Sequence, residues 1–199
     1  MTTDAQSSAP PAAKTLGAME IADPGPLGLA GFAMTTFVLS CFNAGLIKEG
    51  ESVVLGLALA YGGVVQLLAG MWEFRKGNTF GAVAFSSFGG FWISFWVLLT
   101  FAKDATPHSI GVYLLGWTIF TAYMTLAALR TNGAVLSVFV VLTLTFLFLA
   151  IGAFGGSAGM TKVGGGLGLL TALLAWYASC AMVTNATWRR PVLPVWPLA

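Results

Sequence analysis

The stretch Asp23-Pro24-Gly25-Pro26-Leu27-Gly28-Leu29 organises the chain, together with the apolar segment 28–46 that it opens. A proline lacks a backbone N–H and has a fixed φ, so two prolines one residue apart do not belong inside a helix. They suit a first helical turn, whose N–H groups have no partner within the helix. Asp23 or a neighbour can cap those amides. The stretch therefore predicts the start of a helix.

The segment that follows carries more polar groups than a helix surrounded by lipid normally tolerates. Thr35, Thr36, Ser40 and Asn43 lie among its apolar residues. A polar side chain without a partner in an apolar medium costs free energy. We therefore interpret segment 28–46 as a helix with one wet face, which lies towards the inside of a bundle.

Composition indicates that lipid is the solvent for most of the chain. The 199 residues are 57% hydrophobic and 8% charged, whereas soluble domains carry about 25% charged residues. The net charge of +2 provides no basic patch for nucleic acid.

Six apolar segments predict an all-α integral membrane protein with a six-helix transmembrane bundle, since each is close to the ~20 residues that cross a bilayer. They cover Leu27–Leu46, Val53–Trp72, Phe80–Phe101, Ile110–Leu129, Ala134–Phe154 and Val163–Thr187. We expect a disordered cytoplasmic tail over 1–20, the transmembrane domain over 21–188 and a short cytoplasmic tail over 189–199.

Charge placement predicts the orientation in the membrane. Six cations fall in the N-terminal tail, in even-numbered loops or in the C-terminal tail, and three fall in odd-numbered loops. The first group is Lys14, Arg75, Lys76, Arg130, Arg189 and Arg190, and the second is Lys48, Lys103 and Lys162. The positive-inside bias then places both termini in the cytoplasm of a multi-pass protein of the cell membrane, plasma or inner.

Glycines predict close contacts between helices. Gly56, Gly63 and Gly70 form a seven-residue repeat that we expect to keep one face of the second segment smooth. Gly164 and Gly168 form a small-xxx-small pair at the start of the sixth segment.

Residue patterns for catalysis are missing. The single histidine, His108, lies in a predicted extracellular loop, and no His-Glu-x-x-His motif is present. No segment carries a pair of carboxylates near its middle. We therefore expect neither an enzyme nor a metal site nor a cofactor.

A transport path fits the apolar segments better. They contain no Lys or Arg near their centres, so a small carboxylate must be held by neutral donors or cross as the protonated acid. Candidate path residues are the hydroxyls and amides of Thr35, Thr36, Asn43, Gln66, Ser86 and Ser87. For each, the alternative is a hydrogen bond within its own helix or to a neighbouring helix.

The stretch at 23–29, followed by Gly31-Phe32-Ala33-Met34-Thr35-Thr36, resembles the signature of the acetate uptake transporter family, the succinate–acetate permeases. The family motif is Asn-Pro-Ala-Pro-Leu-Gly-Leu, so Asp23 stands where Asn is usual and Gly25 where Ala is usual. The similarity continues through Tyr61-Gly62-Gly63, Gly77-Asn78-Thr79-Phe80-Gly81, Phe91-Trp92 and Leu149-Ala150-Ile151-Gly152. It implies a ring-shaped homo-oligomer, a hexamer, with one pore per subunit.

The resemblance also implies a pore constriction built from Phe32, Phe88 and Leu142. Family members have Tyr at the position of Phe88, so this chain lacks the phenolic donor. An apolar ring can remain, and such a ring gates by controlling wetting.

Two carboxylates at helix boundaries are candidates for a proton-linked or gating role. Asp23 near the pore mouth would repel an anion unless it is protonated or capped. Glu73 ends the second segment two turns from Gln66, on the same face. We favour an ion pair of Glu73 with Arg75 and Lys76, and a proton relay is the alternative.

Together these features predict a channel or transporter for acetate and related short-chain carboxylates, with succinate as a further candidate, favoured by acid or linked to protons. One alternative is a channel for a small neutral solute such as urea, an amide or ammonia. The other is a non-transporting assembly or sensing protein whose polar residues only join its helices.

Overall fold

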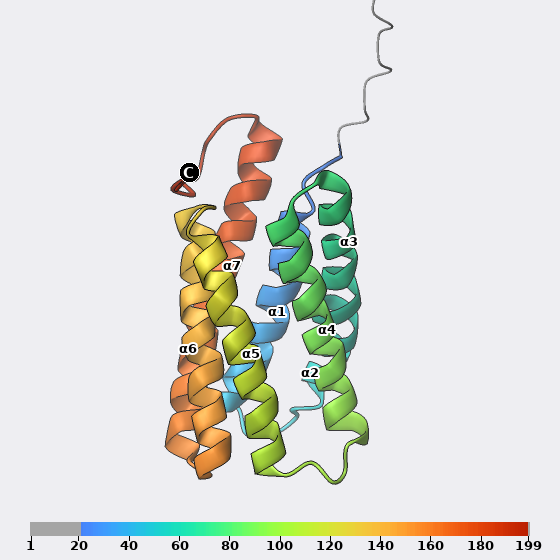
Figure 1. Ribbon diagram of the computed structural model, residues 1–199, viewed down its shortest axis with the longest axis vertical. Helices are drawn as coiled ribbons and strands as arrows, with labels where there is room; N and C mark the ends of the chain where they lie inside the picture. Colours follow the sequence, from blue (N-terminus) through green and yellow to red (C-terminus); the bar gives the residue numbers. More distant parts are fainter. Residues whose placement is uncertain (1–20, 199) are drawn as a thin grey trace, which may run out of the picture.

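The computed structural model describes residues 21–198, and the expected tail over 1–20 lies outside them. Six helical spans in this range are long and apolar enough to cross a membrane, so the all-α six-span architecture is confirmed (Figure 1). The elements are α1 (Gly25–Asn43), α2 (Val53–Leu59), η1 (Ala60–Val65), α3 (Gln66–Lys76), α4 (Thr79–Phe101), α5 (Pro107–Ala128), α6 (Gly133–Gly155) and α7 (Ala158–Trp188). Elements α2, η1 and α3 form one continuous span.

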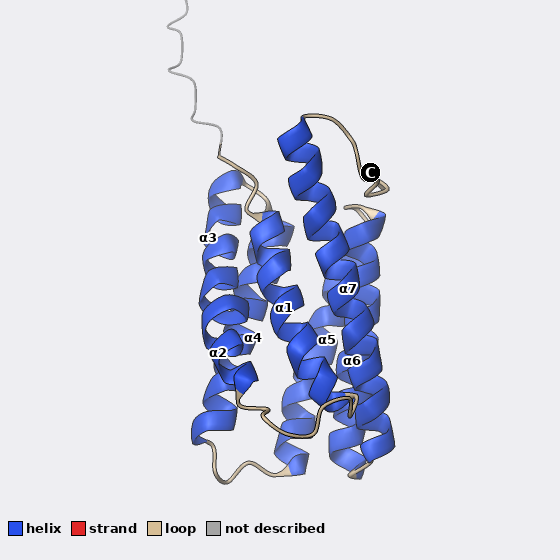
Figure 2. Cartoon of the chain, turned by 180° about the vertical axis from the view of Figure 1, so that it is seen from behind, coloured by secondary structure: helices blue, strands red, loops and turns tan. Residues whose placement is uncertain are grey.

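Two groups of helices make up the bundle, with α1 between them. Helices α5, α6 and α7 pack side by side, as do the second span and α4, and α1 contacts both α7 and the second span (Figures 1 and 2). Helices α4 and α5 follow each other in the chain but contact each other only slightly. Because α1 is the most buried of the six spans, the expected inward position of the first helix is confirmed.

Helices begin where a side chain accepts hydrogen bonds from the first free amides. As expected, the backbone N of Gly25 donates to Oδ1 of Asp23 over 2.9 Å. The N-cap residues of α4, α5, α6 and α7 are Asn78, Thr106, Asn132 and Ser157. Ser157 caps α7, which therefore begins five residues before the expected boundary. Lys162 consequently lies inside the helix rather than in a loop.

The second span contains a π-helical segment, η1. A π-helical turn adds a residue to the turn, so side chains after it are rotated relative to those before it. A Cβ at Gly63 would meet the Ile93 side chain, and one at Gly70 would meet Ser86, both on α4. A Cβ at Gly56 would meet nothing within 4 Å. The expectation of one face shared by three glycines is therefore wrong for Gly56, since η1 intervenes.

Glycines bring α7 against both of its neighbours, as expected. A Cβ at Gly164 would overlap the Leu149 side chain of α6, and a Cβ at Gly168 would overlap the Ser40 side chain of α1. The approach is closest at Gly165, where a Cβ would overlap the backbone at the end of α1. The Gly-rich run therefore serves helix packing.

The C-terminal segment folds back onto the turn between α5 and α6. The backbone N of Gly133 donates to the carbonyl of Trp196 over 2.7 Å, and that of Leu198 donates to Thr131 over 3.1 Å. The Tyr177 hydroxyl donates to the carbonyl of Pro194 over 2.7 Å. Both ends of the described chain thus lie at the same end of the bundle (Figure 1).

Gly165→Ala tests the close approach of α7 to α1. We expect a loss of about 1–3 kcal/mol in the free energy of unfolding, because the backbone beside Gly165 cannot move aside cheaply. Gly166→Ala is the matched control, since open space surrounds that position and Ala favours a helix over Gly by about 1 kcal/mol. Thermal unfolding in detergent measures both, and equal melting temperatures for the two variants would contradict the packing.

Candidate functional site

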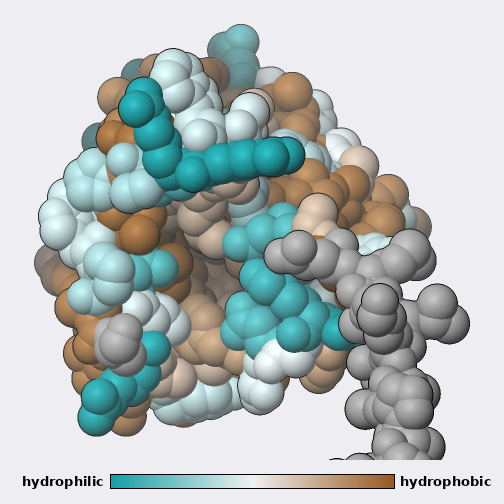
Figure 3. All heavy atoms as spheres, turned by 90° about the horizontal axis from the view of Figure 1, so that it is seen from above, coloured by the Kyte–Doolittle hydropathy of each residue, from teal (hydrophilic) through white to brown (hydrophobic). Residues whose placement is uncertain are grey.

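Three cavities follow one another through the bundle. The Asp23 vestibule, of ≈ 130 Å³, opens at the end that carries both chain ends and is lined by Asp23, Glu73 and Lys76 among others. The central pocket, of ≈ 20 Å³, surrounds Gln66. The Tyr113 vestibule, of ≈ 190 Å³, opens towards the other end. Figure 3 looks onto the first end and shows a hollow with an apolar floor and hydrophilic side chains around it.

The cavities share walls, so they lie in line. Leu29 and Phe139 line both the Asp23 vestibule and the central pocket. Phe32 and Leu142 line both the central pocket and the Tyr113 vestibule. A volume of ~10–15 Å³ on this measure holds one water molecule, so the central pocket is the narrow point of the route.

The three residues expected at the constriction meet at this narrow point. Phe32, Phe88 and Leu142 come from α1, α4 and α6, and all three are buried against the central pocket. The ring centroids of Phe32 and Phe88 lie 5.6 Å apart. Phe88 also contacts the rings of Phe139 and Phe146 on α6, at 6.1 and 6.4 Å. Aromatic contacts of this kind fix the ring positions.

Gln66 supplies the polar group of the central pocket. It is the first residue after η1, and its side chain is 1% exposed. Its Oε1 has no hydrogen-bond partner within residues 21–198. Buried polar atoms are nearly always paired, so an unpaired one indicates an unseen water or ligand.

The Tyr113 vestibule contains polar atoms from several helices. Thr36 and Asn43 of α1 line it, as expected. The Thr36 hydroxyl and the Trp92 indole nitrogen are buried and find no partner among the described residues. The Tyr113 hydroxyl lies 2.8 Å from the Ser94 hydroxyl and 3.1 Å from the carbonyl of Phe91.

Three predicted path residues lie away from the cavities. The Thr35 hydroxyl donates to the carbonyl of Gly31 over 2.9 Å, within its own helix. Ser86 packs against Gly70 between α3 and α4. Ser87 lines none of the three cavities. Thr35 therefore follows the alternative that the sequence left open, a hydrogen bond within its own helix. The Ser86 hydroxyl follows neither possibility, because it finds no partner among the described residues.

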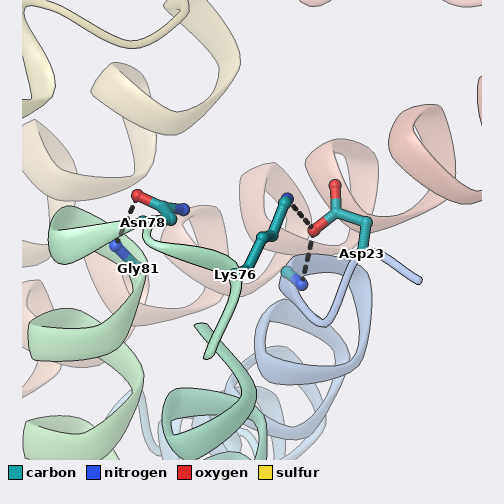
Figure 4. Close-up of polar contacts among 5 residues, drawn as sticks. Asp23, Lys76, Asn78 and Gly81 are labelled. Atoms are coloured by element: carbon teal, nitrogen blue, oxygen red, sulfur yellow. Dashed lines mark hydrogen bonds and ion pairs between the residues drawn. The ribbon is translucent and has the colours of Figure 1, made fainter. Parts of the chain in front are cut away.

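At the Asp23 vestibule the structure corrects the expected ion pair. Nζ of Lys76 lies 2.9 Å from Oδ1 of Asp23 (Figure 4), and within the described residues no ion pair joins Glu73 to a cation. The Glu73 side chain is 1% exposed, lines the cavity on the same face of α3 as Gln66, and leaves Oε2 without a partner in the described part of the chain. Glu73 is therefore a buried charged residue, because it lies on the inner face of α3 and its side chain points into the bundle.

Trp92 and Tyr113 are two polar wall residues that sequence reasoning did not select as site residues. Trp92 appeared only as part of a resembling dipeptide, and Tyr113 gave no motif. Both are aromatic residues with a hydrogen-bond donor in the middle of an apolar segment. A buried donor of this kind needs a polar partner, and this could have indicated a polar site.

The chemistry of the route suits a small polar solute. Within residues 21–198, no three His, Cys, Asp or Glu side chains gather in a way that could hold a metal ion. The unpaired atoms are donors or acceptors of single hydrogen bonds, spaced along three cavities with apolar walls. Apolar walls with a few convergent polar groups are typical of a small-molecule binding site.

Comparison with known proteins identifies the family. The family model described as the GPR1/FUN34/yaaH family matches residues 6–199. The chain belongs to this family. The resemblance to the succinate–acetate permeases is thereby confirmed, as is the six-span fold.

Relatives in this family are similar over most of the chain. Acetate permease A of Emericella nidulans is 42% identical over 92% of this chain and 68% of its own length. The succinate-acetate/proton symporter SatP of Escherichia coli is 38% identical over 90% of this chain and 98% of its own. The solved structure of the bacterial acetate channel SatP matches 88% of this chain and 99% of that one, with a TM-score of 0.85 and 37% identity.

A comparison of Gln66 with Ser86 tests whether the central pocket is hydrated. Both place a buried acceptor without a protein partner, but only Gln66 borders a cavity. Ser86→Ala should raise the free energy of unfolding by about 1 kcal/mol, because it removes an unsatisfied group. Gln66→Met should raise it less, because a water already satisfies Oε1. Melting temperatures in detergent measure both, and an equal or larger gain at Gln66 would argue for a dry pocket.

Proposed function

We propose that this protein is a membrane channel or transporter that passes acetate and related short-chain monocarboxylates through each subunit, with succinate as a further substrate. The family's members include an acetate permease, a succinate-acetate/proton symporter and an acetate channel. A transport role rather than catalysis is what these relatives share.

One observation carries the proposal: buried polar atoms without partners line every cavity of the route. They are Oε2 of Glu73, Oε1 of Gln66, Oγ1 of Thr36 and Nε1 of Trp92. Each such group costs about 1–3 kcal/mol unless something binds it. Four such atoms lie along the cavities. A solute or water that forms a hydrogen bond with each in turn would offset this free-energy cost as it moves along the route.

The apolar ring favours passage of the neutral acid. No Lys or Arg lines the central pocket, whose walls include Phe32, Phe88 and Leu142. An anion stripped of water there would meet no fixed positive charge, which is costly in an apolar site. Transport is therefore acid-favoured or proton-linked, and flux rises as the pH falls.

The proposed setting is the cell membrane, with the Asp23 vestibule on the cytoplasmic side. Arg75, Arg130, Arg189 and Arg190 all belong to the end of the bundle where both described chain ends lie. The positive-inside bias assigns that end to the cytoplasm. A homo-hexamer with one pore per subunit is the proposed assembly, and exposed apolar side chains on every span leave surface for contacts between subunits and with lipid.

A channel for a small neutral solute is the second candidate. Ammonia transport outward protein 2 of Saccharomyces cerevisiae is 43% identical over 90% of this chain and 67% of its own length. The central pocket offers only neutral groups, so ammonia, urea or an amide meets no electrostatic barrier there. Uptake of labelled acetate into proteoliposomes that is blocked by unlabelled acetate but not by ammonium or urea supports the carboxylate route.

Leu142→Ala tests the constriction. Shortening this side chain widens the central pocket, so the flux of a bulkier monocarboxylate relative to acetate should rise about tenfold, equivalent to ~1.4 kcal/mol of barrier. Leu144→Ala on the same helix is the matched control, because Leu144 is exposed on the outer surface. Uptake into proteoliposomes at stepped pH measures both. Unchanged selectivity in Leu142→Ala, or no acetate flux by the native chain at any pH, would reject the proposal.

Thr36→Val and Thr35→Val separate transport from a purely structural role. Thr36 presents an unpaired hydroxyl to the Tyr113 vestibule, so its loss should raise the KM for acetate about tenfold, the effect of one hydrogen bond to a charged group. Thr35 bonds its own helix, so Thr35→Val should leave KM unchanged and lower stability by about 1 kcal/mol. A non-transporting assembly or sensing protein would show no flux for either variant to alter.

A further inference from the structure

Among residues 21–198, the Asp23 vestibule contains one cation, and that cation already has a carboxylate partner. Of the described residues that line this cavity, only Lys76 is a Lys or Arg. Its Nζ lies 2.9 Å from Oδ1 of Asp23. Figure 4 shows that the pair joins the end of α3 to the start of α1, close to Asn78 and Gly81 at the start of α4. The pair therefore stands on the wall of the route at its mouth.

The two side chains of this ion pair differ in how many polar contacts fix them. Oδ1 of Asp23 also accepts a hydrogen bond from the backbone N of Gly25 over 2.9 Å, so the helix start fixes this carboxylate. Lys76 has no second polar partner among the described residues and carries its charge on a flexible four-carbon stem. The side chains are 35% and 36% exposed, and exposed ion pairs add little stability because water screens them. Lys76 is thus the mobile partner.

One oxygen of a second carboxyl group in the same cavity lacks a partner among the described residues. Glu73 is 1% exposed, and its Oε2 accepts no hydrogen bond within residues 21–198. A buried acceptor of this kind indicates that the cavity takes up a hydrogen-bond donor, either water or the hydroxyl of a carboxylic acid. The cavity therefore offers a solute carboxyl group a cation on one wall and an acceptor on another.

We propose that Lys76 is a carboxylate-binding residue of the Asp23 vestibule and that Asp23 is its internal competitor. A solute carboxylate binds when it takes Nζ of Lys76 from Oδ1 of Asp23. This inference rests on the proposed function, because it uses the carboxylate class of substrate.

The competition between Asp23 and the solute for Lys76 sets the selectivity between monocarboxylates and dicarboxylates. With Asp23 in place, the pair is neutral and Glu73 adds an acid, so the vestibule presents no net positive charge to an arriving anion. A dicarboxylate is disfavoured more than a monocarboxylate, because its second charge meets the same carboxylates. Asp23 thus biases the vestibule towards monocarboxylates.

A double-mutant cycle on the full chain tests this mechanism. Asp23→Asn removes the charge and retains a side-chain oxygen that can accept from the backbone N of Gly25, so it should lower the KM and Kd for succinate about two- to fivefold, and those for acetate less. Lys76→Met should raise both constants for both acids. In the Lys76→Met background, Asp23→Asn should have a smaller effect, because only the direct repulsion by Asp23 is then relieved and no cation is released. KM is measured by uptake into proteoliposomes, Kd by titration calorimetry in detergent, and both effects should shrink at high salt.

Arg75→Gln is the matched control, because it removes a neighbouring charge that does not line the cavity. It should leave the ratio of succinate to acetate constants unchanged. An unchanged ratio in Asp23→Asn, an equal effect with and without Lys76, or absence of acetate and succinate binding by the native chain would overturn the inference. If the Kd values shift as expected but the native chain transports no acetate, the inference stands and the proposed function fails.

Discussion

A polar atom buried in a membrane protein has to find its hydrogen-bond partner inside the protein, and this constraint governs the whole bundle. Hydroxyls in α5 and α6 obey it by donating to carbonyls one turn earlier, as Thr118, Thr121 and Thr145 do. Against that background the unpaired atoms stand out, because most of them lie on one line of cavities rather than at random. Among the described residues, four of the five unpaired atoms line the cavities, and Ser86 Oγ at the α3–α4 interface is the exception.

Local chemistry made the fold predictable from the sequence. Proline and Asp23 mark the start of α1, and the length of each apolar run marks a span, so the six spans and the inward first helix follow without long-range information. The meeting of Phe32, Phe88 and Leu142 at one pocket could be expected only through resemblance, since nothing in the residues themselves brings them together from three helices. Their role as a pore constriction stays a prediction.

What could not be predicted depends on how each helix is rotated about its axis. Thr35 and Thr36 are neighbours in sequence, but one faces η1 and bonds its own helix while the other faces the cavity. The π-helical segment shifts the register of the second span, which removes Gly56 from the packed face and fixes where Gln66 and Glu73 point. A count of residues along an ideal helix contains no sign of that extra residue.

The two vestibules differ in the polar groups that line them, and both offer more polar groups than the central pocket between them. The Asp23 vestibule is lined by ionisable groups, whereas the Tyr113 vestibule presents hydroxyls and an indole, with Glu51 as its one acid and no cation among its lining residues. A solute can exchange charge-assisted hydrogen bonds at the first and neutral ones at the second, but the pocket around Gln66 offers only a single amide. The centre therefore offers a solute fewer hydrogen bonds than either vestibule, at the point where Phe32, Phe88 and Leu142 narrow the cavity.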